Sequence, residues 1–245
     1  MSTLQTIYGR KYRGQWLDFL RLRHSSLHLT VAILVSKPKV SRKEMNYWTP
    51  DEAKTFLKSI NKHRLRIIFV LAIHCGMRQG EILGLRLSDI DLEKRKIQIR
   101  HILTFKKQLQ VGAKTNAGNR SITISPVVAE EIRRRIVMIK EEKLAAGERY
   151  EDNGFLVCSK YGTPLSKANC SAVWKRMLKK TNMRIIRFHD LRHTCASLLM
   201  SLDIHPKIVQ EQLGHSSIKI TLDTYSHLMP NMQAEAATAL EKLLM

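Results

Sequence analysis

The apolar and polar residues after position 49 repeat mostly with the period of an α-helix. Thr49, Pro50 and Glu52 have the identities of an N-cap, a first-turn proline and a capping-box glutamate, so we expect a helix, and a domain, to start at Pro50. Residues 64–75 are mostly apolar, which predicts a buried second helix that Gly76 ends. Further helices are expected from Arg78, over residues 126–146, and from Lys167, His189, Pro206, Ile218 and Met232.

A different pattern, alternation with a period of two, interrupts these helices. In residues 96–104, Ile97 and Ile99 share one face, which is typical of a strand. Residues 108–114 and 120–125 predict two more strands, joined through the turn-rich sequence TNAGN. The fold class expected from both patterns is mainly α-helical with a small three-stranded antiparallel β-sheet.

The first 46 residues lack the patterning of the rest. Residues 36–46, SKPKVSRKEMN, are basic and show no apolar period, which indicates a linker. The longest apolar runs, residues 29–35 and 67–73, are too short to cross a bilayer. We therefore expect a short N-terminal segment with a basic linker at 1–46, a single domain at 47–245, and no membrane partner.

Composition adds a strong positive charge. Lys and Arg number 42 against 21 Asp and Glu, giving a net charge of +21. The positive charges of such a domain repel one another unless a polyanion binds nearby, and nucleic acid is the usual polyanion. The alternative is a basic ribosome-like or membrane-surface protein. The four cysteines form no CxxC pair, which argues against a disulfide framework or a Cys-rich zinc module. A reducing cytoplasm is the expected location.

Proton carriers and fixed cations gather near the C-terminus. The stretch FHDLRHTCAS holds His189, Arg192 and His193, and LGHSSIKITLDTYSH adds His215 and Tyr225. His189 and His193 are spaced as a zinc pair, but the intervening Glu of HExxH and a third ligand at standard spacing are lacking. A phosphodiester is an anion that repels nucleophiles, and arginine guanidiniums can bind its oxygens and offset that charge. Arginines and histidines followed by a tyrosine hydroxyl are therefore suited to attack on a phosphodiester.

Four segments together carry a family resemblance. GMRQGEILGLRLSDID, AKTNAGNRSITIS, HDLRHTCASLL and QLGHSSIKITLDTYSHL, in this order and separation, resemble the catalytic domain of the tyrosine recombinase (phage integrase) family from about Tyr47 onward. The resemblance implies six active-site residues, which are Arg78, Lys114, His189, Arg192, His215 and the nucleophile Tyr225. Glu81 matches an acidic residue that supports such sites, although it is also placed to be a simple helical ion-pair partner.

The roles of these residues follow from the chemistry. The two arginines clamp the non-bridging oxygens, while Tyr225, a phenol with an ordinary pKa of about 10, needs help to lose its proton. His189 is the candidate to accept that proton, and His215 donates to the phosphoryl oxygen. Lys114 is expected to protonate the leaving 5′-oxygen, with Lys106 and Lys107 as neighbouring competitors. No metal or other cofactor is required in this scheme.

The function that the resemblance implies is site-specific DNA recombination through a 3′-phosphotyrosyl intermediate, resealed without ATP. Its expected partners are double-stranded DNA, three further protomers in a homotetramer on DNA, and accessory DNA-bending or directionality proteins. The amphipathic helix from Met232 suits packing on a neighbouring protomer. The short N-terminal segment at 1–46 resembles the remnant of a core-binding domain. It leaves open a truncated integrase that binds DNA without completing recombination, and a type IB topoisomerase-like enzyme is a further alternative.

Overall fold

The structure, a computed structural model, describes residues 46–104, 106, 108–111, 120–226 and 232–245. The chain divides into two units, Met1–Glu44 and Met45–Met245, and the description concerns the second. The N-terminal segment predicted at 1–46 therefore lies almost wholly outside the described residues, and its nature stays a prediction.

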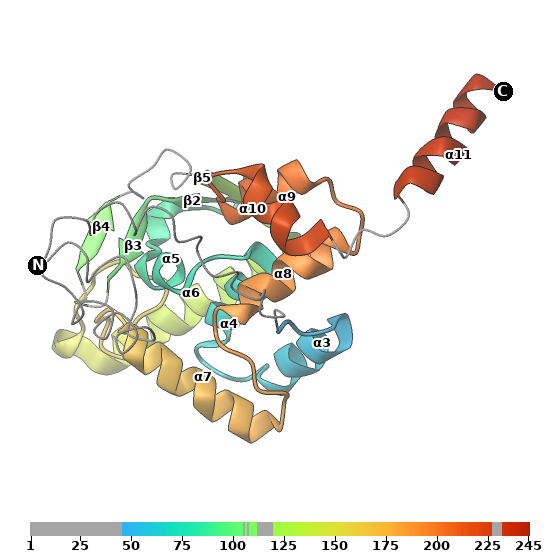
Figure 1. Cartoon of the computed structure of the whole chain (residues 1–245). Coiled ribbons are helices and arrows are strands. Elements are labelled where there is room, and N and C mark those ends of the chain that lie inside the picture. The colour runs from blue at the N-terminus through green and yellow to red at the C-terminus, as the bar shows by residue number, and fades with distance from the viewer. Residues whose placement is uncertain (1–45, 105, 107, 112–119, 227–231) are drawn as a thin grey trace, which may run out of the picture. The chain divides into compact units, whose positions relative to one another are not determined.

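Helices make up most of the described chain (Figure 1). They are α3 (Pro50–Ser59), α4 (Arg66–Cys75), α5 (Gln79–Gly84), α6 (Pro126–Ala146), α7 (Lys167–Thr181), α8 (Asp190–Met200), α9 (Pro206–Leu213), α10 (Ile218–Tyr225) and α11 (Met232–Leu244), with the 3-10 turns η2 (Leu87–Asp89) and η4 (Gly147–Arg149). The predicted start at Pro50 is confirmed, because Thr49 and Glu52 form the reciprocal capping box. Among the described residues, no helix combines the length and apolarity that a membrane crossing needs.

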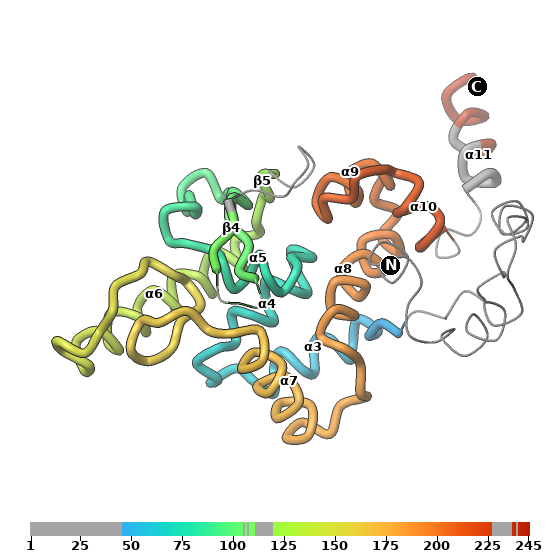
Figure 2. The backbone as a smooth tube through the Cα atoms, turned by 60° about the vertical axis from the view of Figure 1, so that its left-hand side comes forward, coloured from blue at the N-terminus to red at the C-terminus, as the bar shows by residue number. Residues whose placement is uncertain are grey.

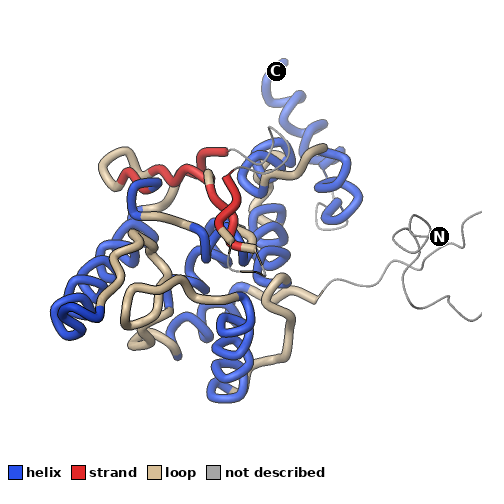
Figure 3. The backbone as a smooth tube through the Cα atoms, turned by 90° about the vertical axis from the view of Figure 1, so that its left-hand side faces the viewer, coloured by secondary structure: helices blue, strands red, loops and turns tan. Residues whose placement is uncertain are grey.

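The three-stranded antiparallel sheet exists, and two of its strands fall within predicted ones, but the third strand is a different segment. The sheet consists of β1 (Ile90–Asp91), β2 (Lys96–Ile99) and β5 (Arg120–Thr123), in the order β1-β2-β5, while β3 (His101–Leu103) pairs only with β4 (Leu109–Val111). The strand predicted over 96–104 is broken at Arg100, and the strand predicted over 108–114 does not join the sheet. Figure 3 shows the strands grouped beside the helices.

The break at Arg100 has a packing reason. After it, β3 leaves the sheet and lies against α5, where the missing side chain of Gly84 permits close approach. A Cβ on Gly84 would lie 2.9 Å from the Leu103 nitrogen and 3.0 Å from the His101 oxygen. Tertiary contact with a helix thus overrides the alternating pattern that favours one long strand.

The main core surrounds α4, in which every residue from Ile67 to Ile73 is buried. Aromatic rings pack on it in tilted and edge-on pairs: Trp48 and Phe56 have centroids 4.9 Å apart, and Trp48 and Trp174 5.5 Å. The Trp48 backbone N–H donates to Thr194 Oγ1 on α8 over 3.0 Å. The residues that precede α3 are therefore fixed to the helix that carries the histidine and arginine motif.

A second, smaller core joins α8, α9 and α10, which lie together in Figures 1 and 2. Its buried members are Ala196, Met200, Val209, Leu213 and Tyr225. The two cores are linked where α4 ends: Gly76 has a positive φ of 62°, and a Cβ there would lie 2.5 Å from Leu213 Cδ2. This close approach brings the segment after α4 up to α9.

Candidate active site

Arg78 is fixed at the start of α5 by the carboxylate of Glu81. Arg78 Nη1 donates to Glu81 Oε1 over 2.8 Å, and the Arg78 backbone N–H donates to Oε2 over 2.8 Å. Arg78 Nη2 donates to the carbonyl of Gly214 over 3.0 Å, 136 positions away in sequence. The first motif is thereby held against the LGH segment that ends α9.

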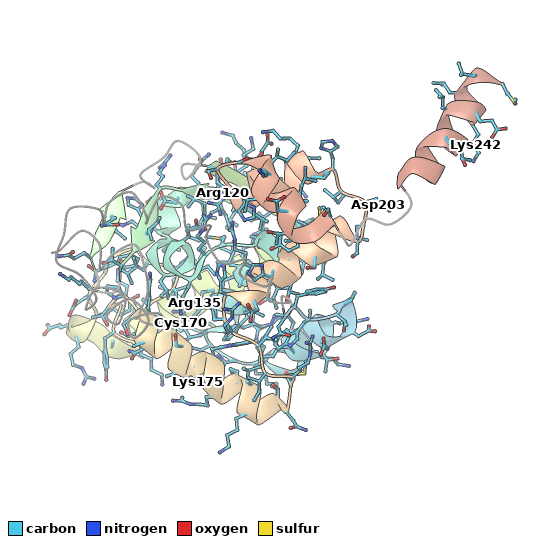
Figure 4. The ribbon with its side chains drawn as sticks, in the orientation of Figure 1. Arg120, Arg135, Cys170, Lys175, Asp203 and Lys242 are labelled. Atoms are coloured by element: carbon cyan, nitrogen blue, oxygen red, sulfur yellow. The ribbon has the colours of Figure 1, made fainter. Side chains whose placement is uncertain are left out.

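Arg120 on β5 completes this group and was missed by the sequence analysis (Figure 4). Its guanidinium donates to both oxygens of Glu81, over 3.0 and 2.9 Å, and its Nε donates to the carbonyl of Gln212 over 2.9 Å. Burial alone would raise the pKa of Glu81, but the hydrogen bonds and charges of Arg120 and Arg78 outweigh it and hold that pKa below its ordinary value. Glu81 therefore carries its charge while only 2% exposed.

Arg192 is buried on α8 and points its guanidinium at the end of α4. Its Nη1 donates to the carbonyl of Gly76 over 2.6 Å, whereas its buried Nη2 has no hydrogen-bond partner among the described residues. Burial, followed by repulsion from Arg78, lowers the pKa of Arg192 to about 9, so it stays charged at neutral pH. A buried, unsatisfied cationic N–H is costly and is satisfied well by an anion.

Two predicted histidines lie close to these cations. His215, on the turn between α9 and α10, bonds Thr221 Oγ1 through Nδ1 over 2.9 Å, and burial with repulsion from Arg192 and Arg78 lowers its pKa to about 4. His189 occupies the N-cap position of α8, and its pKa is lowered by burial and by Arg192. Both rings are therefore mostly neutral at pH 7, so each has one nitrogen that donates and one that accepts.

Tyr225 ends α10 with its side chain turned into the smaller core. It is 1% exposed, and its hydroxyl lies 2.6 Å from Nδ1 of His193. Burial raises the pKa of Tyr225 above its ordinary value, although Arg192 opposes this. The sequence analysis considered His193 only as a possible zinc partner of His189. His193 lies four residues after His189, and this helical spacing indicates that both side chains face the same side of α8. The sequence analysis used the spacing only to consider a zinc site.

The structure brings five of the six predicted residues together: Arg78, His189, Arg192, His215 and Tyr225. Lys114 lies outside the described residues, in the segment between β4 and β5. Among the described residues no group of three or more His, Cys, Asp and Glu side chains is placed to hold a metal ion. The His189–His193 pair instead forms an edge-on ring contact with centroids 5.1 Å apart.

Comparison with known proteins identifies the family. The phage integrase family model matches residues 46–232, so the chain belongs to the phage integrase family. It is 31% identical over 216 residues to the tyrosine recombinase XerC-like protein of Caldanaerobacter subterraneus subsp. tengcongensis, covering 82% of this chain and 55% of that protein. It is 30% identical over 214 residues to the ICEBs1 integrase of Bacillus subtilis, covering 86% and 58%. The chain thus spans little more than half the length of these relatives.

Solved structures confirm the fold class. The Tn1549 transposon integrase in complex with transposon right end DNA matches with a TM-score of 0.67 and 25% identity, over 84% of this chain and 69% of that one. The catalytic domain of bacteriophage HP1 integrase matches with a TM-score of 0.52 and 19% identity, over 80% and 95%, and supports the fold alone. The mainly helical domain with a small antiparallel sheet is the catalytic fold of this family.

Proposed function

We propose that this chain is the catalytic part of a site-specific DNA recombinase that cleaves and rejoins DNA through a 3′-phosphotyrosyl bond to Tyr225. The observation that carries the proposal is the buried, unsatisfied Nη2 of Arg192, held within the electrostatic reach of Arg78 and Tyr225. A phosphodiester bound by both guanidiniums would satisfy that N–H and lie close to the hydroxyl.

The charge of the group supports a phosphoryl-transfer role. Arg78 and Arg120 both repel the charge of Arg192, and the carboxylate of Glu81 opposes them. Three cations against one anion leave an excess of two positive charges. A phosphodiester carries one negative charge, and its five-coordinate transition state concentrates up to two on the non-bridging oxygens. The excess therefore matches the transition state better than the ground state, as catalysis requires.

The remaining steps belong to the same proposal. Tyr225 attacks phosphorus, and the 5′-oxygen leaves as a hydroxyl when it gains a proton, for which Lys114 is the proposed donor. His215 donates to a non-bridging oxygen through its Nε2, since Nδ1 is engaged by Thr221. A 5′-hydroxyl from a second strand then attacks the phosphotyrosine, gives its proton to the Lys114 amine that was left neutral by the first step, and restores the backbone. Because the bond energy is kept in the covalent intermediate, no ATP is consumed.

Double-stranded DNA is the proposed substrate, and the net charge of +21 supports it. Exchange between two duplexes involves four cleavage events, so we propose a homotetramer on DNA, with accessory DNA-bending or directionality proteins as further partners. The solved complex of the Tn1549 transposon integrase with transposon right end DNA is consistent with this substrate class.

The test uses nicked duplexes with randomised sequence, which release a short strand after cleavage and trap the covalent complex. The wild-type chain is expected to form an SDS-resistant adduct, and Tyr225→Phe to form none while retaining DNA binding. Tyr161→Phe is the matched control, because Tyr161 is 49% exposed and lies outside the site. An adduct that persists in Tyr225→Phe would exclude this nucleophile. Plasmid relaxation by the wild type without strand exchange would indicate a topoisomerase instead.

A further inference from the structure

The Tyr225 hydroxyl meets a histidine that none of the family motifs places at the nucleophile. Within the described residues His193 is its hydrogen-bond partner, with 2.6 Å between Nδ1 and the hydroxyl oxygen. His189, the proton acceptor expected from the sequence, contacts the edge of the His193 ring and makes no described hydrogen bond to Tyr225. Building on the function proposed above, we propose that His193 is the catalytic residue that takes the proton from Tyr225.

The proton transfer balances within these two side chains. In the neutral imidazole with its proton on Nε2, the lone pair of Nδ1 accepts the bond from the Tyr225 hydroxyl. As the phenolic oxygen attacks phosphorus, its O–H bond breaks and an N–H bond forms on Nδ1, which leaves an imidazolium. When the phosphotyrosyl bond is later broken by a 5′-hydroxyl, the same proton returns to the phenolate oxygen. Neither direction requires an external oxidant, reductant or metal.

Helix geometry gives His193 this position and not His189. His193 follows Arg192 on α8, so the guanidinium that binds phosphate and the imidazole that binds the nucleophile share one rigid helical turn. That turn is anchored from both sides: Arg192 donates to the carbonyl of Gly76, and Thr194 Oγ1 accepts from the backbone N–H of Trp48. Movement of the imidazole relative to the phosphate clamp is therefore restricted.

The surroundings of His193 favour the neutral form of both groups when no DNA is bound. Burial, then the charges around it, lowers the pKa of His193 to about 4, while burial raises the pKa of Tyr225, so both groups are neutral at pH 7. A phosphate anion beside Arg192 would oppose the positive charges and raise the basicity of His193. The titratable and charged groups that act on His193 are His189, Asp190, Arg187 and Arg192 from α8 and its approach, His215 from the α9–α10 turn, and Tyr225 from α10.

The test separates proton transfer from mere hydrogen bonding. In His193→Asn, the side-chain oxygen replaces Nδ1 as an acceptor for the Tyr225 hydroxyl, but it cannot take up the proton. We expect the single-turnover rate of adduct formation on nicked duplexes to fall by about 100-fold or more, the usual contribution of a general base. The wild-type rate should rise with pH and then level off, whereas the Asn variant should keep rising through pH 9 because hydroxide replaces the missing base.

His189→Asn is the matched comparison, since both rings lie on one helix. A rate for His193→Asn within a few-fold of wild type, with the wild-type pH plateau, would overturn the proposal. Loss of the plateau in His189→Asn alone would return the role to His189. Thermal unfolding of each variant checks that it folds. If the wild type forms no adduct on any duplex, the function proposed above fails. If the wild type forms the adduct and His193→Asn behaves like it, only the role of His193 fails.

An independent readout needs no cleavage. Imidazole nitrogen NMR of the full chain at pH 7 should show Nδ1 of His193 unprotonated and Nε2 protonated, and Tyr225→Phe should shift the Nδ1 signal by removing its donor. A protonated Nδ1 at neutral pH would mean that the ring donates to Tyr225, and the proton-acceptor role would be overturned.

Discussion

Replacing the buried carboxylate of Glu81 by Gln is the sharpest test of the charge arrangement around the site. Each oxygen of Glu81 accepts two hydrogen bonds, from Arg78 Nη1 and Arg120 Nη1 at Oε1, and from the Arg78 N–H and Arg120 Nη2 at Oε2. In Glu81→Gln, an NH2 group replaces one oxygen, so two donors lose their acceptor and face another donor. The guanidiniums also lose their counter-charge.

The expected cost follows from burial. Glu81 is 2% exposed and the Arg120 side chain 8%, so solvent does little to compensate either group. Removing one partner of a buried ion pair costs about 3–5 kcal/mol. In a domain of this size each kcal/mol lowers the melting temperature by about 2–4 °C, which predicts a decrease of roughly 6–20 °C near neutral pH.

The same variant makes a pH prediction with a defined sign. The folded-state pKa of Glu81 lies below its ordinary value of 4.5, so the carboxylate contributes its full stability above that pH and loses it as pH falls through the folded pKa. The difference between wild type and Glu81→Gln should therefore be constant from pH 6 to 8 and shrink below about pH 4.

Differential scanning fluorimetry across pH measures both effects. Glu130→Gln is the matched control, because the Glu130 carboxylate is 73% exposed and its ion pair in the described part of the chain is with Arg133 on the surface of α6. Its expected effect is about 0.5 kcal/mol or less. A Glu81→Gln variant that melts within a degree or two of wild type at pH 7 would refute the view that this carboxylate balances the arginines.

Two further predictions concern the chemistry. Arg192→Lys should fold but lose at least about 100-fold in adduct formation, because a single ammonium cannot bond the Gly76 carbonyl and also present a planar fork to phosphate; near-wild-type adduct formation would show that a point charge suffices. Adduct formation should persist in excess EDTA, since fixed guanidiniums are proposed to fill the electrostatic role of a metal; loss of adduct that magnesium or zinc restores would contradict the metal-free scheme.

Sequence reasoning worked where local signals and tertiary packing agree. The capping residues at Thr49 and Glu52, the left-handed Gly76 and the prolines that begin α3, α6 and α9 all fixed helix ends close to the observed ones. The strands were less predictable, because the departure of β3 from the sheet depends on its contact with α5, which no local pattern encodes. Family motifs picked out Arg78, Arg192 and Tyr225, and the folded chain places Arg78 and Tyr225 within electrostatic reach of Arg192.

The residues that were missed act through long-range contacts. Arg120 received no role from the sequence beyond the start of a predicted strand, and the folded chain shows that it bonds both Glu81 and Gln212. His193 was recognised as a helical neighbour of His189, but its partner Tyr225 lies 32 positions further along. Helical periodicity indicates which face a side chain occupies, and it does not indicate what another helix brings to that face.

The wide sequence separation of the site contacts has a consequence for the cell that makes this protein. Arg78 is held by Gly214, 136 positions later, and Arg192 by Gly76, 116 positions earlier. At about 5–20 residues per second, the ribosome adds the later partner of Arg78 on the order of ten seconds after Arg78 itself. A growing chain, or a fragment that terminates before α9, therefore contains Arg78 and Arg192 but not an assembled candidate active site. Under the proposed function, we expect such a fragment to form no covalent adduct with DNA.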